Sequence, residues 1–167
     1  MSEAPTPEQM DELWHALVEV QTLASDPELS QRPEVFENAL ASAYAISNNF
    51  AIVGIVSYAR GRFEALQELA QRSPFGEATI TFPRAALLRA RPPGAPEALF
   101  DECLDLIETE VMEGGDIEPL VANLTETGGL NAFRLLTLVC VILGKMVVRA
   151  DPALASMEDL LARETGG

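Results

Sequence analysis

One apolar segment in the C-terminal part of the chain constrains the fold more than any other feature. Ten uncharged residues, Leu135 to Gly144, lie between Arg134 and Lys145. A helix that spans a bilayer needs about 20 apolar residues, whereas a run of about 10 to 14 is typical of a buried core helix. The apolar residues occupy nearly every side of the helical turn, which indicates that protein surrounds this helix. We therefore predict a central core helix over residues 131–149 and no membrane span.

The N-terminal part of the chain carries signals for two further helices. Thr6 to Gln9 form a capping box with Pro7 at the first helical position, so a helix should begin there and end near Ser25. Helical spacing predicts that this helix buries a stripe made of Met10, Leu13, Trp14, Leu17 and Val18. A second helix should begin at Pro33 and bury Phe36, Leu40, Ala43 and Ser47.

A joint at Asn48 and Asn49 precedes a segment that is ambiguous at its start, residues 50–71. Four β-branched residues between 52 and 56 would also suit a strand. The continuation has clear helical spacing and no turn signal, so we predict one long helix. Gly54 and Gly61 within it each cost roughly 1 kcal/mol relative to alanine. We therefore expect each glycine to permit a close helix contact or a bend.

The rest of the chain is predicted to be mostly helical as well. Residues 78–82 alternate in polarity and could form one short strand. Two prolines and a glycine indicate a hinge-like linker at residues 92–95. We expect helices at 96–113, 117–124 and 152–163 in addition to the central helix. The predicted fold is an all-α bundle of six to seven helices, organised as a single domain over residues 1–167.

Residues that commonly bind metals or act as nucleophiles are scarce. His15 is the only histidine, and Cys103 and Cys140 are far apart, so the usual zinc ligand sets cannot be assembled. No phosphate-binding glycine loop or EF-hand pattern is present. His15, with Asp11 and Glu19 four residues to either side, has the spacing of a solvated ion-pair ladder. Both cysteines occupy apolar helix positions and should be buried thiols. We predict no metal, no cofactor and no enzymatic activity.

The distribution of charge is the most informative feature for function. The chain has 26 acidic and 11 basic residues and a net charge of −15. Residues 92–133 contain ten acidic residues and no Lys or Arg. The helix predicted there carries an acidic stripe at helical spacing, which comprises Glu97, Asp101, Asp105 and Glu108. The only basic cluster precedes the linker and comprises Arg84, Arg89 and Arg91.

Two interpretations of the acidic stripe stay open from the sequence. The stripe can be a solvated face that keeps the protein soluble, with the arginines folded back onto it. It can also bind a basic surface of a protein partner, with the arginines as a further contact. Direct nucleic-acid binding is disfavoured, because phosphate contacts need Lys and Arg residues that are scarce here.

The segregated charge and the missing catalytic residues predict a non-enzymatic protein that docks a basic partner surface. Such a protein could be an inhibitor, an immunity or anti-defence factor, or an adaptor. One alternative is a structural subunit of a larger homo- or hetero-oligomeric assembly. Another is a helical small-ligand sensor or an enzyme without a readable motif, with a pocket lined by Trp14, Phe50, Tyr58 and Phe133. The N-terminal residues lack the features of a secretory signal and predict a cytoplasmic protein.

Overall fold

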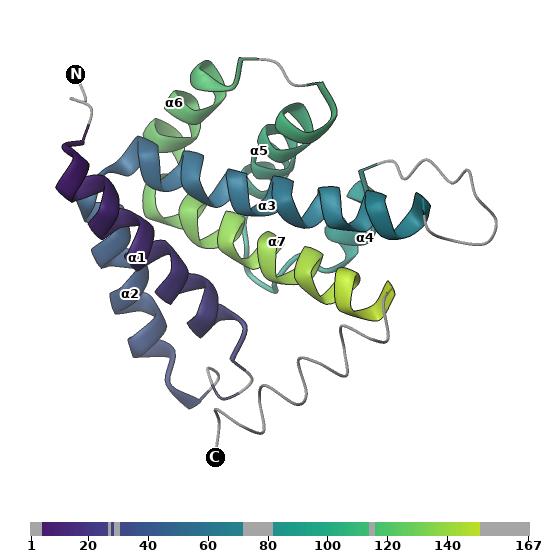
Figure 1. The fold of residues 1–167 in the computed structure, drawn as a ribbon, viewed down its shortest axis with the longest axis horizontal. Coiled ribbons are helices and arrows are strands. Elements are labelled where there is room, and N and C mark those ends of the chain that lie inside the picture. Colours follow the sequence, from purple (N-terminus) through teal and green to yellow (C-terminus); the bar gives the residue numbers. More distant parts are fainter. Residues whose placement is uncertain (1–4, 27, 29–30, 72–81, 114–115, 151–167) are drawn as a thin grey trace.

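The chain folds into a bundle of helices (Figure 1). The structure, a computed structural model, describes residues 5–26, 28, 31–71, 82–113 and 116–150. Within these ranges it contains seven α-helices, one π-helical turn and no strand, which confirms the predicted all-α bundle. The helix predicted at 152–163 lies outside the described residues. So does the predicted strand at 78–82, except for Phe82, which is not in a strand.

Two long helices, α3 (Asn48–Gln71) and α7 (Gly129–Ala150), form the centre of the bundle. They run side by side in the same direction (Figure 1). Two contacts show how they are aligned: Cys140 Sγ lies 3.3 Å from Ile55 O, and Arg62 Nη1 donates to Cys140 O at 2.5 Å. Helix α7 also contacts α1, α2, α5 and α6, which confirms the predicted central apolar helix.

Helix α7 is also long and apolar enough to cross a membrane by length and composition alone. Half of its most apolar 18-residue window is buried inside the bundle, and the core helix of a soluble protein meets the same criteria. Helices α2 and α3 meet them only when taken as one pair, which is bent by 117°. Packing in the bundle accounts for the buried half of this window, while the absence of a membrane span stays a prediction.

Helices α1 (Pro7–Ala24) and α2 (Pro33–Ile46) form an antiparallel hairpin that packs on this centre (Figure 1). The predicted capping box is present: Gln9 N donates to Thr6 Oγ1 at 3.2 Å, and Thr6 N donates to Gln9 Oε1 at 2.9 Å. Arg134 on α7 pairs with Glu37 on α2 through both Nε and Nη2. Helix α2 buries three of its predicted residues, Phe36, Leu40 and Ala43, and Ser47 is half-buried at its end.

The predicted buried stripe of α1 is wrong for three of its five residues. Leu13 and Leu17 are buried, but Met10, Trp14 and Val18 are 39%, 53% and 45% exposed. Val20 and Gln21 complete the buried face instead, although the Gln21 amide has no hydrogen-bond partner among the described residues. The apolar residues of α1 span a wider arc than its neighbours cover, so the row of three lies at the edge of the contact.

The joint before α3 is a sharp corner. Ser47 is extended (φ −164°, ψ 117°), and α3 begins at the next residue and continues as one helix, as predicted. A Cβ added at Gly54 would lie 2.4 Å from Leu17 Cδ1, so this glycine permits the close approach of α1. A Cβ added at Gly61 would meet no atom of the described residues within 4 Å. A close helix contact is therefore not the reason for the second glycine.

The segments after residue 82 complete the bundle. They form α4 (Arg84–Arg89), α5 (Glu97–Glu108), the π-helical turn η2 (Thr109–Glu113) and α6 (Glu118–Thr127). The short helix α4 was not predicted. Residues 92–95 form a β-turn in which Ala95 N donates to Pro92 O at 3.1 Å and Gly94 has a φ of 85°, the conformation of a type II turn. Buried residues from both sides of this turn, such as Phe63 and Phe100, belong to one hydrophobic cluster.

Candidate functional site

Arg84 on α4 binds the predicted acidic stripe of α5. Its Nη1 lies 2.8 Å from Asp105 Oδ1 and 3.7 Å from Glu108 Oε2, and its Nη2 lies 3.5 Å from Asp101 Oδ1. Arg84 Nη2 also donates to Asp101 O at 3.3 Å. One guanidinium thus bridges three of the four carboxylates in the stripe. It lowers the negative charge that this surface can present to a partner.

The other predicted site residues lie apart from this cluster. Glu97 is exposed in the first turn of α5 and forms no ion pair with any described residue. Arg89 is exposed at the end of α4 and likewise forms none within the described ranges. Arg91 donates from Nη1 to Ala95 O and so holds the turn after α4. The structure therefore assembles Arg84 with Asp101, Asp105 and Glu108 only.

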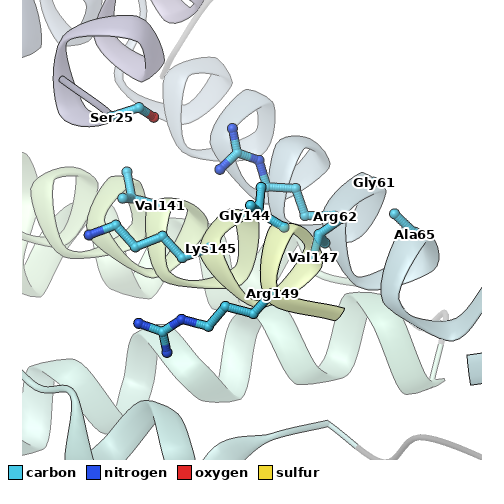
Figure 2. Close-up of a pocket in the computed structure, with 10 residues that line it drawn as sticks. Ser25, Gly61, Arg62, Ala65, Val141, Gly144, Lys145, Val147 and Arg149 are labelled. Carbon is cyan, nitrogen blue, oxygen red and sulfur yellow. The ribbon is translucent and has the colours of Figure 1, made fainter. Parts of the chain in front are cut away.

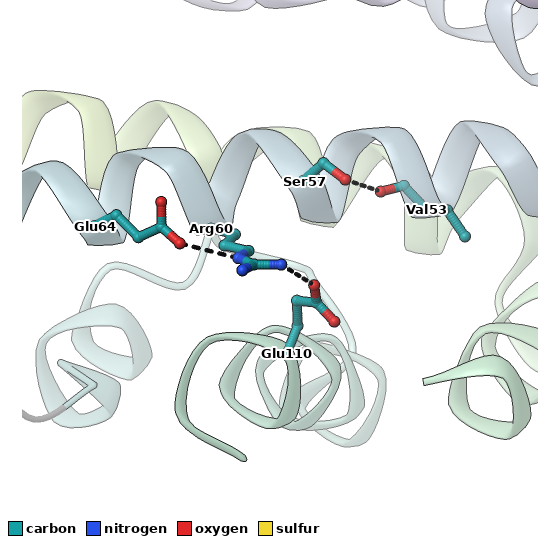
Figure 3. Close-up of polar contacts among 5 residues, drawn as sticks. All are labelled: Val53, Ser57, Arg60, Glu64 and Glu110. Atoms are coloured by element: carbon teal, nitrogen blue, oxygen red, sulfur yellow. Dashed lines mark hydrogen bonds and ion pairs between the residues drawn. The ribbon is translucent and has the colours of Figure 1, made fainter. Parts of the chain in front are cut away.

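A second arginine, Arg60, binds acidic residues that lie outside the stripe of α5. Arg60 of α3 lies between Glu64 on its own helix and Glu110 on η2 (Figure 3). Its Nε is 2.9 Å from Glu64 Oε1, and its Nη1 is 3.1 Å from Glu110 Oε1. Arginines from outside residues 92–133 therefore neutralise part of that acidic segment and hold it to α3 and α4.

Helix α1 presents a different kind of acidic surface. Met10, Trp14 and Val18 follow one another at a spacing of four residues, which places them in a row on the helix. The Trp14 ring stacks on Tyr58 of α3, with centroids 5.6 Å apart and planes inclined by 18°. The exposed row therefore lies along the side of α1 that faces α3.

Asp11 adjoins this apolar row on the helix, and α1 contains no Lys or Arg. Four exposed acidic residues lie on the helix: Glu8, Asp11, Glu12 and Glu19. We call these four residues, together with Met10, Trp14 and Val18, the α1 surface. His15 Nδ1 lies 2.8 Å from Asp11 O and 3.7 Å from Asp11 Oδ2, whereas no described contact joins it to Glu19. The wide apolar arc of α1 was the sequence signal for this surface, and we interpreted it as core.

The two cysteines are free and fully buried, as predicted. Burial raises the pKa of both thiols to about 12; the Glu102 carboxylate adds to the rise at Cys103, and the Arg62 guanidinium opposes it at Cys140. A nucleophilic cysteine needs solvent access and a lowered pKa. Neither thiol has these properties.

The four aromatic residues proposed to line a pocket occupy different environments. Trp14 and Tyr58 stack near the surface, whereas Phe133 is fully buried and stacks on Tyr44 with centroids 5.8 Å apart. Phe50 is partly exposed near the start of α3. None of the four predicted residues lines the cavity between α3 and α7 that is described below.

In the part of the chain that the structure describes, no three His, Cys, Asp or Glu residues come together in a group that could hold a metal ion. The arrangement therefore offers two acidic surfaces, one bridged by Arg84 and one with an exposed apolar row. No protein-family model, curated protein or solved structure matches this chain.

Proposed function

We propose that this protein acts by binding a basic protein partner and that the α1 surface is the docking site. The observation that supports this is the exposed row of Met10, Trp14 and Val18 on a helix that carries four exposed acidic residues and no Lys or Arg. Protein interfaces combine an apolar centre, in which Trp and Met are enriched, with a polar rim. An amphipathic helix with Lys or Arg beside its apolar face would complement both features.

The stripe of Glu97, Asp101, Asp105 and Glu108 is the second candidate surface for the same partner. Three of its carboxylates already accept contacts from Arg84, so a basic partner would have to displace that guanidinium. The α1 surface needs no such exchange within the described structure. For this reason the proposal places docking on α1.

The proposed role is non-enzymatic, as an inhibitor, an immunity or anti-defence factor, or an adaptor in the cytoplasm. The burial of both thiols and the exposed position of His15 support this part of the proposal. In the described structure His15 contacts Asp11 and no Cys, Ser or Thr side chain, so it activates no nucleophile of the kind that covalent catalysis needs.

The test compares partner capture by two variants, with elution at low and then high salt. The α1 variant carries Trp14→Ala and Val18→Ser, and the stripe variant carries Glu97→Gln, Asp101→Asn, Asp105→Asn and Glu108→Gln. We expect a basic protein that the wild type and the stripe variant retain and that salt releases. The α1 variant should bind the purified partner at least about tenfold more weakly, because aromatic residues at the centre of an interface dominate its affinity.

Matched controls are available on other helices. Val35 and Met112 are 41% and 46% exposed, so Val35→Ser and Met112→Ala remove similar apolar surface elsewhere and should leave binding unchanged. Loss of the partner from the stripe variant alone would place docking on α5. Binding of the partner by both variants at wild-type strength would place docking on neither surface. Capture of only this chain, insensitive to salt, would favour a structural assembly.

A further inference from the structure

A cavity of about 520 Å³ lies between α3, the C-terminal half of α7 and the end of α1 (Figure 2). The ten described residues that line it include three cations, Arg62, Lys145 and Arg149, and no Asp or Glu. The whole chain has 26 acidic against 11 basic residues, so this lining reverses the charge of the rest of the molecule. Figure 2 shows the Arg62 side chain extending toward Ser25 of α1, while Lys145 and Arg149 extend from α7 to the left of the view.

Arg62 is held in place by the packing of α3 on α7. Its Nη1 donates to Cys140 O at 2.5 Å, and a Cβ added at Gly144 would lie 2.3 Å from the same nitrogen. The guanidinium therefore lies across the gap that this glycine leaves in α7. A guanidinium has five N–H donors, and Cys140 O is the one acceptor for this side chain among the described residues, so the other donors can bind a ligand from a fixed position.

Lys145 and Arg149 lie one turn apart on α7, where like charges repel. Neither forms an ion pair with any residue in the described ranges. A cation in the last turn of a helix interacts favourably with the helix dipole, which accounts for Arg149. It does not account for Arg62 on another helix or for the cavity between them.

We propose that this cavity binds a small organic oxyanion, with a phosphate or carboxylate group on a compact apolar body. Arg62, Lys145 and Arg149 bind the charged group, and Ala65, Val141 and Val148 form the wall for the apolar part. The volume is within the range of small-molecule sites, about 300–1,000 Å³. The proposal is independent of docking on the α1 surface.

The test is titration calorimetry on the full chain with phenyl phosphate, phenylacetate, inorganic phosphate and neutral phenol. We expect one site for each organic anion, weaker binding of inorganic phosphate and none of phenol. Lys145→Gln and Arg149→Gln should each weaken binding by about tenfold, the effect of a lost charge-assisted hydrogen bond. Arg89→Gln changes the net charge equally outside the cavity and should have no effect. Amide NMR shifts at Gly61 and Gly144 should report binding in wild type.

Several results would overturn the proposal. No binding of either organic anion by a folded wild type would do so. If Lys145→Gln, Arg149→Gln and Arg89→Gln weaken anion binding equally, the anion responds to the net charge of the protein and not to a site. Binding confined to phosphatidylcholine vesicles that contain phosphatidic acid, and lost in Lys145→Gln, would replace a soluble ligand with a lipid headgroup. Thermal unfolding of each variant separates lost binding from lost folding.

Discussion

Two glycines of α3 have very different surroundings in the bundle. An alanine Cβ at Gly54 would lie 2.4 Å from Cδ1 of Leu17, which is 1% exposed and cannot easily move. An alanine Cβ at Gly61 would meet no described atom within 4 Å. In both positions alanine favours the helix by about 1 kcal/mol. At Gly54 this gain competes with an overpacking penalty of about 1–3 kcal/mol.

We therefore expect the two alanine variants to have opposite effects on stability. Gly61→Ala should raise the free energy of unfolding by roughly 0.5–1 kcal/mol. Gly54→Ala should lower it by about 1 kcal/mol, because the overpacking penalty exceeds the gain in helix propensity. Urea unfolding of both variants measures the two effects. Similar stabilisation by both would contradict the close approach of α1 to α3.

At the scale of helices, Arg84 holds α4 to α5. Its positive charge also reduces the repulsion among the three carboxylates that it contacts. Arg84→Gln should lower the free energy of unfolding by about 1 kcal/mol, near the upper end for partly exposed ion pairs. High salt should reduce the difference in the free energy of unfolding between wild type and Arg84→Gln, because salt screens the repulsion among the three carboxylates. Thermal unfolding at low and high salt measures it.

The matched control is Arg89→Gln at the other end of α4, which removes the same charge without breaking a described ion pair. It should leave stability almost unchanged. If the two variants are equally stable at low salt, Arg84 does not join α4 to α5.

Helix ends were predictable because their signals are local. The Thr6 capping box, Pro33 and the corner at Asn48 all specify a boundary through neighbouring residues, and the predicted ends agree to within a few residues. The short helix α4 has too few residues for a periodic pattern and was missed. The contact between Arg62 and Cys140 depends on which helices are neighbours. No local pattern specifies that, so the cavity could not be predicted.

The candidate docking site was also only partly predictable, because local sequence patterns do not specify which helices are neighbours. The acidic stripe of α5 was readable because its charges follow helical spacing, but its pairing with Arg84 was one of two open interpretations. The exposure of Trp14 and Val18 could not be read from α1 alone, because it depends on how much of that helix its neighbours cover. Sequence periodicity identifies an apolar arc and not the part of it that is buried.

For the whole molecule, the two buried thiols predict a loss of stability in alkali. The pKa of each is about 12 in the folded chain, against an ordinary value of 9.0. Their contribution to stability is therefore fully present below pH 9 and is lost as the pH rises toward 12. Each thiol should lower the free energy of unfolding by up to about 1.4 kcal/mol per pH unit in that window.

Urea unfolding between pH 8 and 11 measures this slope, and Cys103→Ala with Cys140→Ala should flatten it. Some slope should remain above pH 10 in that variant, because burial also raises the pKa of Tyr44 and Tyr58. A slope that the double variant does not change would show that the thiols titrate freely in the folded chain.

The pairing of α3 with α7 has a consequence for how the chain folds during synthesis. The residues that join the two helices, Arg62 and Cys140, are 78 positions apart. At about 5–20 residues per second, α3 leaves the ribosome on the order of ten seconds before α7 can cover it. The part of α3 that α7 covers is therefore exposed on the nascent chain throughout that interval. A growing chain of this protein should depend on chaperones until its last described helix emerges.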